Sequence, residues 1–583
     1  MAVRNSDEVL VVVVGGAVGV GAALWAGGAL SALVCGHPVP GGHPLAGLLA
    51  FGEMGDPSAA WGFSVGPAFA YWVITLVVLA SAITIVLLLS RVLTSLGADA
   101  SGHGSRADGL AGRGQVRRAA GVRVLARKSD MLRPSLSRPR PTDVGYRLGR
   151  ASGVACWASV EDSLVVLGPP RSGKGLHLVI PAILDAPGAV VTTSTRPDNL
   201  AATIKARERV GPVAVFDPQG LANGVAATTR WSPIRGCEVP RVAMARARAL
   251  CPDPAKGIEN GSFWTQQCYI AVRCLLHAAA LDHRPPVELY RWSLSALVAE
   301  QAAEILTTHP DAAPAWSTAL EAILGTDPRQ RDSVWAMVAN TFAALADPNV
   351  LDAVSPASGQ QFDPDQFLRE RGSLYLLGTA SDASATANLV AAFIEDIVEC
   401  ARHLAAASSG ARLDPPLAVI LDEAANYPMP SLPALMSDGG GTGLTTMVVL
   451  QSLAQARARW GRHEAAAIWD AAIVKLILGG SGSAEDLRDL SALIGTRTER
   501  RINDSWGRDG HRSSSTSTHE VPILDTGRLR TLPFGKAVLL LRSAPPILLH
   551  LQPWTRRRDA ASLTGERAEM ETTLRGTAGE TAA

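Results

Sequence analysis

The stretch SLVVLGPPRSGKGLHLVIPAILDA, from Ser163 to Ala186, decides the fold of this chain. It begins with a short apolar run typical of a buried strand, continues with the glycine-containing loop GPPRSGKG, and ends in an apolar helical segment. In such a loop the backbone N–H groups turn inward on phosphates, the helix N-terminus adds positive potential, and a lysine reaches the β- and γ-phosphates. The stretch therefore indicates a nucleotide-binding loop between a strand and a helix.

The loop supplies eight candidate nucleotide-binding residues, among which Gly168, Gly173 and Lys174 fill the roles just described. The strict form of the motif next requires Ser or Thr to hold Mg²⁺, whereas this sequence has Gly175. A structural turn that happens to contain a lysine is the alternative, and the loop alone does not decide between the two. The eight residues are Gly168, Pro169, Pro170, Arg171, Ser172, Gly173, Lys174 and Gly175.

The segment LAVILDEAANYP, from Leu417 to Pro428, favours the nucleotide site. Its five apolar residues predict a buried strand that delivers Asp422 and Glu423 to its carboxyl end, where ligands bind in open α/β sheets. The first acid can hold Mg²⁺ and the second can polarise the attacking water, with an exposed acidic turn as the alternative. The nearby strand TMVVLQ ends at Gln451, which can sense the γ-phosphate or orient water, or is simply a solvated strand end.

Apolar runs elsewhere predict more strands, and helical patterns lie between many of them, so we expect an α/β fold with a mostly parallel sheet covered on both faces. The runs lie at residues 188–193, 213–216, 373–378, 473–478, 538–541 and 547–551. The first run leads into TSTRPDNL, whose hydroxyl residues at the carboxyl edge are candidates to replace the missing magnesium ligand. They are Thr193, Ser194 and Thr195.

Residues 239–350 lack strand patterns, and apolar residues recur there at helical spacing, as from Trp264 to Leu275. We therefore expect an all-helical insertion that divides the ATPase domain into a first part, residues 151–238, and a second part, residues 351–555.

Two uncharged stretches within residues 1–95, at about 9–35 and 67–90, exceed the ~20 residues that cross a bilayer. The segment between them contains Glu53 and Asp56 but no Lys or Arg, whereas basic residues follow the second stretch. This asymmetry predicts a multi-pass anchor in the inner (plasma) membrane, with both termini and the ATPase body in the cytoplasm. A cleaved signal peptide is the alternative for the first stretch, but its apolar run exceeds the expected ~7–15 residues.

Composition sets the remaining limits. The formal net charge of +1 excludes a protein that coats nucleic acid by bulk charge, and the seven cysteines form neither a disulfide framework nor a zinc site. Residues 96–150 are Gly/Ser-rich and then basic, which predicts a linker that contacts anionic membrane lipid, or alternatively nucleic-acid phosphates. Residues 500–520 are polar and predict a mobile loop, and residues 556–583 predict a disordered tail.

In order and spacing, these motifs resemble the coupling proteins of type IV secretion and conjugation, the TraG/TraD family. The resemblance covers about residues 150–555 plus the membrane pair, and it rests on GPPRSGKGLHLVIP, FDPQG, the helical insertion, LDEAANYP and SDGGGTGLTTMVVLQSLAQARARWG. It implies a RecA-like P-loop ATPase that uses ATP and Mg²⁺ and assembles as a homo-hexamer around a pore. Its implied partners are DNA or a relaxase–DNA complex and the subunits of a type IV secretion channel.

Carried over to this chain, the resemblance implies that Lys174 binds phosphate, Asp422 coordinates Mg²⁺, Glu423 is the catalytic base and Gln451 is the sensor. Members closest to this motif also have glycine where this chain has Gly175. Many relatives carry an arginine in the segment SDGGGTG, which here has none, and the absence of such a finger predicts slow turnover. Other candidate arginines are Arg457, Arg459, Arg497, Arg500 and Arg501.

The sequence thus predicts a membrane-anchored ATPase that recruits DNA or a DNA–protein substrate and helps translocate it into a type IV secretion or conjugation channel. With a net charge near zero, contact with DNA would be local, made to phosphates and independent of sequence. Two alternatives remain open: an FtsK/HerA-like DNA-pumping ATPase, and a non-hydrolysing membrane receptor for secretion cargo.

Overall fold

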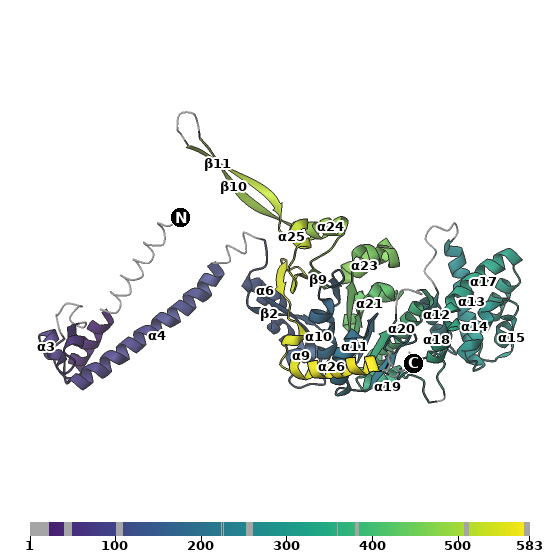
Figure 1. The fold of residues 1–583 in the computed structure, drawn as a ribbon, viewed down its shortest axis with the longest axis horizontal. Helices are drawn as coiled ribbons and strands as arrows, with labels where there is room; N and C mark the ends of the chain where they lie inside the picture. Colours follow the sequence, from purple (N-terminus) through teal and green to yellow (C-terminus); the bar gives the residue numbers. More distant parts are fainter. Residues whose placement is uncertain are drawn as a thin grey trace. The chain divides into compact units, whose positions relative to one another are not determined.

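The computed structural model divides into two compact units, Met1–His103 and Gly104–Ala583 (Figure 1). It describes all residues except 1–21, 40–48, 101–108, 223, 226, 252–260, 358, 379–383, 507–511 and 577–583.

The first unit is helical, with short segments η1 (Ala50–Gly52) and α3 (Pro57–Trp61) and the long helix α4 (Ala68–Ala100). Its window Ala68–Ile85 has a mean hydropathy of 2.2, and α4 is the one helix within the described residues that is long and apolar enough to cross a membrane. It contains most of the second predicted stretch. Residues 9–21 of the first predicted stretch lie outside the described residues, and the described part contains a shorter apolar helix, Ala22–Val34.

The second unit is built on an eleven-stranded sheet with the order β2-β1-β13-β12-β9-β3-β8-β7-β4-β6-β5. The strands from β9 to β5 in this order pair in parallel, and those from β9 to β2 pair antiparallel. This arrangement confirms the expected α/β fold with a mostly parallel sheet. The strands are β1 (Gly145–Ala151), β2 (Val154–Ser159), β3 (Leu164–Leu167), β4 (Val190–Ser194), β5 (Val213–Phe216), β6 (Ser373–Leu377), β7 (Leu417–Leu421), β8 (Leu444–Leu450), β9 (Val474–Leu478), β12 (Lys536–Leu541) and β13 (Ile547–His550).

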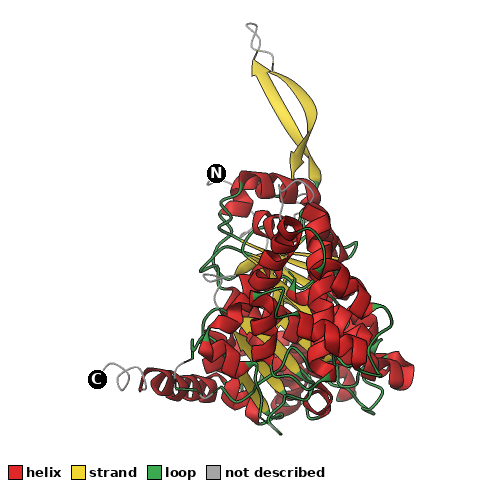
Figure 2. Ribbon diagram, turned by 90° about the vertical axis from the view of Figure 1, so that its right-hand side faces the viewer, coloured by secondary structure: helices red, strands yellow, loops and turns green. Residues whose placement is uncertain are grey.

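Helices cover both faces of this sheet (Figure 2), and alternate residues of the central strands enter separate cores. Along β3, Val165 and Leu167 pack into one core, whereas Leu164 and Val166 pack into the other. Since side chains of a strand alternate between faces, a near-continuous apolar run is required when both faces are buried. Outside residues 240–353, the helices that follow β3 and precede residue 557 are η2 (Gly175–Val179, a π-helical turn), α10 (Ile180–Asp185), α11 (Asp198–Glu208), α19 (Pro364–Arg369), α20 (Ser384–Ala407), η4 (Ser409–Ala411), η5 (Ala424–Asn426), α21 (Leu432–Thr442), α22 (Leu453–Trp460), α23 (Arg462–Ala471), α24 (Ala484–Ile494), α25 (Thr526–Arg530) and η6 (Trp554–Arg556).

Between β5 and β6 the described chain is helical from residue 240 to residue 353, apart from the connections between helices. The helices are α12 (Pro240–Leu250), α13 (Gly261–Leu281), α14 (Pro286–Leu294), α15 (Glu300–Thr308), α16 (Trp316–Leu324), α17 (Pro328–Phe342), η3 (Ala343–Ala346) and α18 (Pro348–Ala353).

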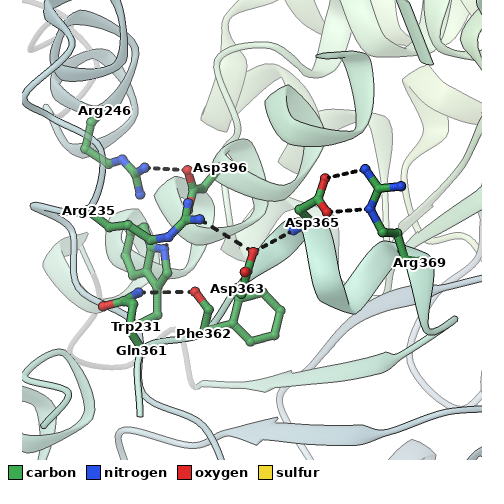
Figure 3. Close-up of polar contacts among 9 residues, drawn as sticks. All are labelled: Trp231, Arg235, Arg246, Gln361, Phe362, Asp363, Asp365, Arg369 and Asp396. Atoms are coloured by element: carbon green, nitrogen blue, oxygen red, sulfur yellow. Dashed lines mark hydrogen bonds and ion pairs between the residues drawn. The ribbon is translucent and has the colours of Figure 1, made fainter. Parts of the chain in front are cut away.

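A buried polar cluster joins the base of these helices to α20 (Figure 3). Arg246 of α12 donates to Oδ1 of Asp396 on α20 at 2.7 Å, and the indole of Trp231 donates to Oδ2 at 2.9 Å. The Trp231 indole stacks on Phe393 at a centroid distance of 4.8 Å. The Arg246 guanidinium lies 4.6 Å from the centre of the Trp231 ring. Charge and aromatic packing together fix α12 against the sheet domain.

The prediction of a linker at residues 96–150 was wrong. From about residue 109, the described part of this segment folds onto the sheet. Val116, Leu125 and Leu132 are buried, and Arg133 Nε pairs with Asp414 Oδ1 at 2.6 Å. Apolar residues spaced between the basic ones give each short helix one buried side, which a count of basic residues conceals. The helices are α6 (Arg113–Ala120), α7 (Val122–Ala126), α8 (Ser129–Leu132) and α9 (Pro141–Val144), and β1 follows them.

Two further predictions were wrong. The tail is not disordered in its described part: α26 (Ala560–Gly576) buries Leu563 and Met570, seven residues apart and therefore on one side of the helix. The predicted mobile loop is instead an antiparallel hairpin, β10 (Thr496–Trp506) with β11 (Arg512–Pro522), whose eleven pairs run in uninterrupted register. Figure 2 shows this hairpin projecting from the helices around its base.

Candidate nucleotide-binding site

The candidate site lies at the carboxyl edge of neighbouring strands. The loop after β3, Gln451 after β8, Asp422 and Glu423 after β7, and the hydroxyl residues at the end of β4 belong to strands adjacent in the order β3-β8-β7-β4. Because these strands are parallel, their carboxyl ends meet at one edge, where open α/β sheets bind ligands. The fold thus brings together residues up to 283 positions apart in the chain, from Gly168 to Gln451.

The loop Gly168–Gly175 turns sharply at two positions with positive φ, Arg171 at +63° and Gly173 at +89°. A Cβ on Gly173 would lie 2.8 Å from both His177 and Phe534, so no larger residue fits without displacing them. His177 and Phe534, which sequence reasoning did not select, pack edge to face with ring centroids 5.1 Å apart. They support the outer side of the loop.

The Lys174 ammonium folds back on its own loop, donating to the carbonyl oxygens of Gly168 at 2.5 Å and Pro169 at 3.0 Å. Only 9% of the residue is exposed. Burial lowers the pKa of Lys174, although the nearby carboxylates of Asp422 and Glu423 oppose that shift. The lysine is therefore a cation held next to two acids at the mouth of the loop.

Asp422 is half-buried. Its Oδ2 accepts a hydrogen bond from Asn199 Nδ2 at 3.0 Å, and its backbone carbonyl accepts one from Thr193 Oγ1 at 2.9 Å. Burial raises the pKa of Asp422, and the neighbouring Glu423 carboxylate adds to that shift, whereas the Asn199 hydrogen bond and the Lys174 ammonium oppose it. A carboxylate with a pKa shifted in this way, beside a phosphate-binding loop, is a candidate for a functional role.

Glu423 has a left-handed backbone, with φ +53°, a costly conformation for a residue with a side chain. Its Oε2 accepts hydrogen bonds from Thr195 at 2.9 Å and Asn426 at 3.1 Å, and its Oε1 accepts one from Gln451 Nε2 at 3.1 Å. Gln451 is thus not merely a solvated strand end, and the acid pair is not an exposed acidic turn. The three donors fix the direction of the Glu423 carboxylate.

The hydroxyl residues proposed as magnesium ligands are already engaged. Thr193 bonds to the Asp422 carbonyl, Ser194 donates to the carbonyl of Arg196 at 2.6 Å, and Thr195 holds Glu423. Sequence reasoning missed Asn199, the one side chain among the described residues that hydrogen-bonds to the Asp422 carboxylate. It stands in the quoted segment TSTRPDNL, and only the packing of α11 against the end of β7 reveals it.

Of the candidate arginines, Arg457 is bound within its own chain, donating to Asp486 at 3.1 Å and Asp489 at 3.2 Å. The side chains of Arg500 and Arg501 lie outside the described part. The structure therefore selects none of the five for a role at a neighbouring subunit.

The donor set fits Mg²⁺, which prefers oxygen ligands and usually combines one or two carboxylates with substrate phosphates and water. Asp422 and Asn199 offer such oxygens beside the phosphate loop. No group of three His, Cys, Asp or Glu side chains forms a ready metal cage in the described ranges.

Fold and site together define a P-loop ATPase domain of RecA-like architecture. Residues 122–238 match the family model described as type IV secretory system conjugative DNA transfer, and residues 416–534 match the model described as the TraM recognition site of TraD and TraG. The chain belongs to the TraG/TraD family of coupling proteins. No curated protein sequence matches it.

Three solved structures share this fold. The bacterial conjugative coupling protein TrwBdeltaN70, unbound, superposes with a TM-score of 0.53 at 17% identity, covering 74% of this chain and 93% of its own. TrwB with the non-hydrolysable ATP analogue ADPNP gives 0.53 at 16% identity, with the same coverage. TrwB with ADP and Mg²⁺ gives 0.52 at 16% identity, covering 72% and 91%.

Proposed function

We propose that this chain is a membrane-anchored ATPase that couples ATP hydrolysis to the transfer of DNA, or of a relaxase–DNA complex, into a type IV secretion channel. The observation that carries the proposal is the hydrogen-bonded pair of Glu423 and Gln451 beside Lys174 and Asp422, at the carboxyl edge of a sheet that belongs to this family.

Each side chain has one task in this proposal. Lys174 leaves the carbonyls of Gly168 and Pro169 for the nucleotide phosphates, joined by the backbone N–H groups of the loop. Glu423, aimed by Thr195, Asn426 and Gln451, accepts a proton from the attacking water. Gln451 contacts both this base and the γ-phosphate region, so it relates the presence of that phosphate to the position of the base.

ATP and Mg²⁺ are the proposed ligands, in keeping with the TrwB structures that contain ADPNP, or ADP and Mg²⁺. When bound, Mg²⁺ neutralises charge on the phosphates. Asp422 and Asn199 are the residues that would hold it in this chain.

The remaining parts of the proposal concern assembly and location. Helix α4, with the apolar stretch before it, anchors the chain in the inner membrane with the ATPase body in the cytoplasm. The ATPase domain comprises residues 151–238 and 351–555, with the insertion at 239–350, and it acts as a homo-hexamer. Contact with DNA is local, because the net charge is only +1, and it is made to phosphates without regard to sequence.

The test measures hydrolysis and nucleotide binding by the detergent-solubilised full chain. We expect Glu423→Gln to bind ATP as the parent does while losing about 10²- to 10⁴-fold in turnover, since it removes the general base. Lys174→Ala should lose nucleotide affinity. Glu485→Gln, an exposed acid on α24, is the matched control and should hydrolyse ATP at the parent rate.

Hydrolysis at the parent rate by Glu423→Gln would contradict the proposed base. A parent protein that binds ATP but does not hydrolyse it, with or without DNA, would favour the alternative of a non-hydrolysing receptor.

A further inference from the structure

The phosphate loop lacks a hydroxyl side chain at Gly175, where the P-loop motif requires Ser or Thr. A hydroxyl group at this position of a P-loop normally offers its oxygen to Mg²⁺. A hydroxyl is also a donor, able to hydrogen-bond a neighbouring carboxylate while its lone pairs face the metal. Glycine can do neither, so a chain that uses Mg²⁺ needs another group with both capacities at the same place.

Asn199 stands at that place. Its Nδ2 donates to Asp422 Oδ2 at 3.0 Å, and its Oδ1 lies 3.7 Å from the point where a Cβ on Gly175 would be. Only 4% of Asn199 is exposed. A carboxamide has donors on its nitrogen and lone pairs on its oxygen, so one side chain supplies both functions of the absent hydroxyl.

The position of Asn199 is fixed from behind. Its backbone carbonyl accepts a hydrogen bond from Thr203 Oγ1 at 2.6 Å, and the same hydroxyl bonds to Tyr375 on β6, also at 2.6 Å. Both partners are buried. The first turn of α11 is therefore tied to the sheet, and the carboxamide stays oriented before any ligand arrives.

We propose that Asn199 replaces the missing hydroxyl of the phosphate loop, with Nδ2 positioning Asp422 and Oδ1 serving the Mg²⁺ that accompanies the nucleotide. This inference rests on the proposed function, because it assumes a nucleotide with its metal at this loop. The role of the missing hydroxyl is thereby assigned to a side chain of α11, a helix outside the P-loop motif.

The experiment titrates Mn²⁺, as a paramagnetic substitute for Mg²⁺, into the full-length chain saturated with ADP, and follows free Mn²⁺ by electron paramagnetic resonance. We expect Asn199→Ala to weaken Mn²⁺ binding about 10- to 100-fold, the range for residues that support a metal site. Affinity for ADP in the presence of EDTA should stay within about threefold of the parent. Asn199→Leu, which preserves bulk without polar atoms, should give the same loss.

The decisive measurement is whether a hydroxyl placed at residue 175 restores the Mn²⁺ affinity lost in Asn199→Ala. A Cβ on Gly175 would meet no atom closer than 3.7 Å, so Gly175→Ser fits without displacing the backbone. In the Asn199→Ala background it should recover most of the lost Mn²⁺ affinity. The matched control is Asn388→Ala, which removes another buried asparagine, bonded to the Leu250 carbonyl at 3.0 Å, and should leave Mn²⁺ binding unchanged.

Parent-like Mn²⁺ affinity in Asn199→Ala overturns the inference while leaving the proposed function intact. So does a loss that Gly175→Ser does not restore and that extends to ADP binding in EDTA, since that pattern means a structural role. A parent chain that binds neither ADP nor Mn²⁺ overturns the proposed function, and the inference with it.

Discussion

Two half-buried aspartates, Asp396 and Asp422, have contrasting surroundings. Asp396, in the cluster of Figure 3, is surrounded by donors: Arg246, Trp231 and Arg235 all reach its carboxylate, at 2.7, 2.9 and 3.4 Å. Asp422, at the end of β7, accepts from a neutral carboxamide and forms no ion pair with any side chain in the described part of the chain.

The difference separates a charge that the fold compensates from one that the proposed function assigns to ligand binding. A buried carboxylate needs compensation, and at Asp396 the fold itself supplies it with guanidinium groups. At Asp422 the fold supplies less, so the capacity to bind a cation remains available for a ligand. The stability predictions that follow change Asp396, then Asp422, and then one member of a solvent-exposed ion pair.

The largest effect is expected for Asp396→Ala, which leaves the Arg246 guanidinium, 3% exposed, buried without its carboxylate. Removing one partner of a buried pair typically costs about 3–5 kcal/mol of unfolding free energy. Chemical denaturation of the purified chain, followed by tryptophan fluorescence, measures it. An Asp396→Ala variant as stable as the parent would mean that the cluster does not hold the helices to the sheet.

Asp422→Asn should act in the opposite direction. It keeps the shape of the side chain while removing a buried negative charge beside Glu423, so we expect a gain of about 0.5–2 kcal/mol at pH 7, as for other stabilising changes at functional sites. The same variant should lose Mn²⁺ affinity. A loss of stability comparable to that of Asp396→Ala would show that Asp422 is structural too.

The pH dependence sharpens this contrast. Burial raises the pKa of Asp422 above its ordinary value of 3.8, so between these two values the folded chain binds more protons than the unfolded chain. The parent therefore loses stability as the pH rises through this window, while Asp422→Asn does not. The advantage of the variant should grow as the pH rises through the raised pKa of Asp422 and vanish as the pH falls toward 3.8. A constant advantage would rule out the buried charge as its cause.

The smallest effect belongs to a pair in the same close-up, Arg369 with Asp365, which lies in solvent with the side chains 65% and 43% exposed. Although its distances of 2.5 and 3.1 Å are short, exposed pairs contribute little. We expect Arg369→Ala to leave the unfolding midpoint unchanged within error. A clear loss would make proximity, rather than burial, the deciding variable.

The site was predictable to the extent that it depends on strand ends. Lys174, Asp422, Glu423 and Gln451 each follow an apolar run, and the carboxyl ends of parallel strands meet at one edge. Asn199 was not predictable, because its role depends on a contact with a residue 223 positions away. Its sequence context is that of an ordinary polar residue at the start of a helix.

The wrong predictions about the fold have the same cause, because these segments are also ordered by contacts with residues far away in the sequence. Residues 109–144 and α26 bury a few apolar side chains each, against surfaces that are formed by distant segments. The β10–β11 hairpin lacks the apolar alternation that marks a half-buried strand, so its pairing gave no local signal. Composition describes what a segment could do alone, whereas these segments are ordered by their contacts.

The hairpin also has a mechanical consequence. Its eleven-residue strands span about 37 Å at ~3.4 Å per residue, and β10 begins at Thr496, one residue after the Gly495 cap of α24. Helix α24 in turn contacts the chain just after Gln451. Its buried residue Asp486 accepts a hydrogen bond from the backbone N–H of Leu453, two residues beyond Gln451. With an arm of this length, a tilt of roughly 10° at its base carries the far end through an arc of about 6 Å. The hairpin is thus a lever that would magnify small movements beside Gln451 into displacements larger than a side chain.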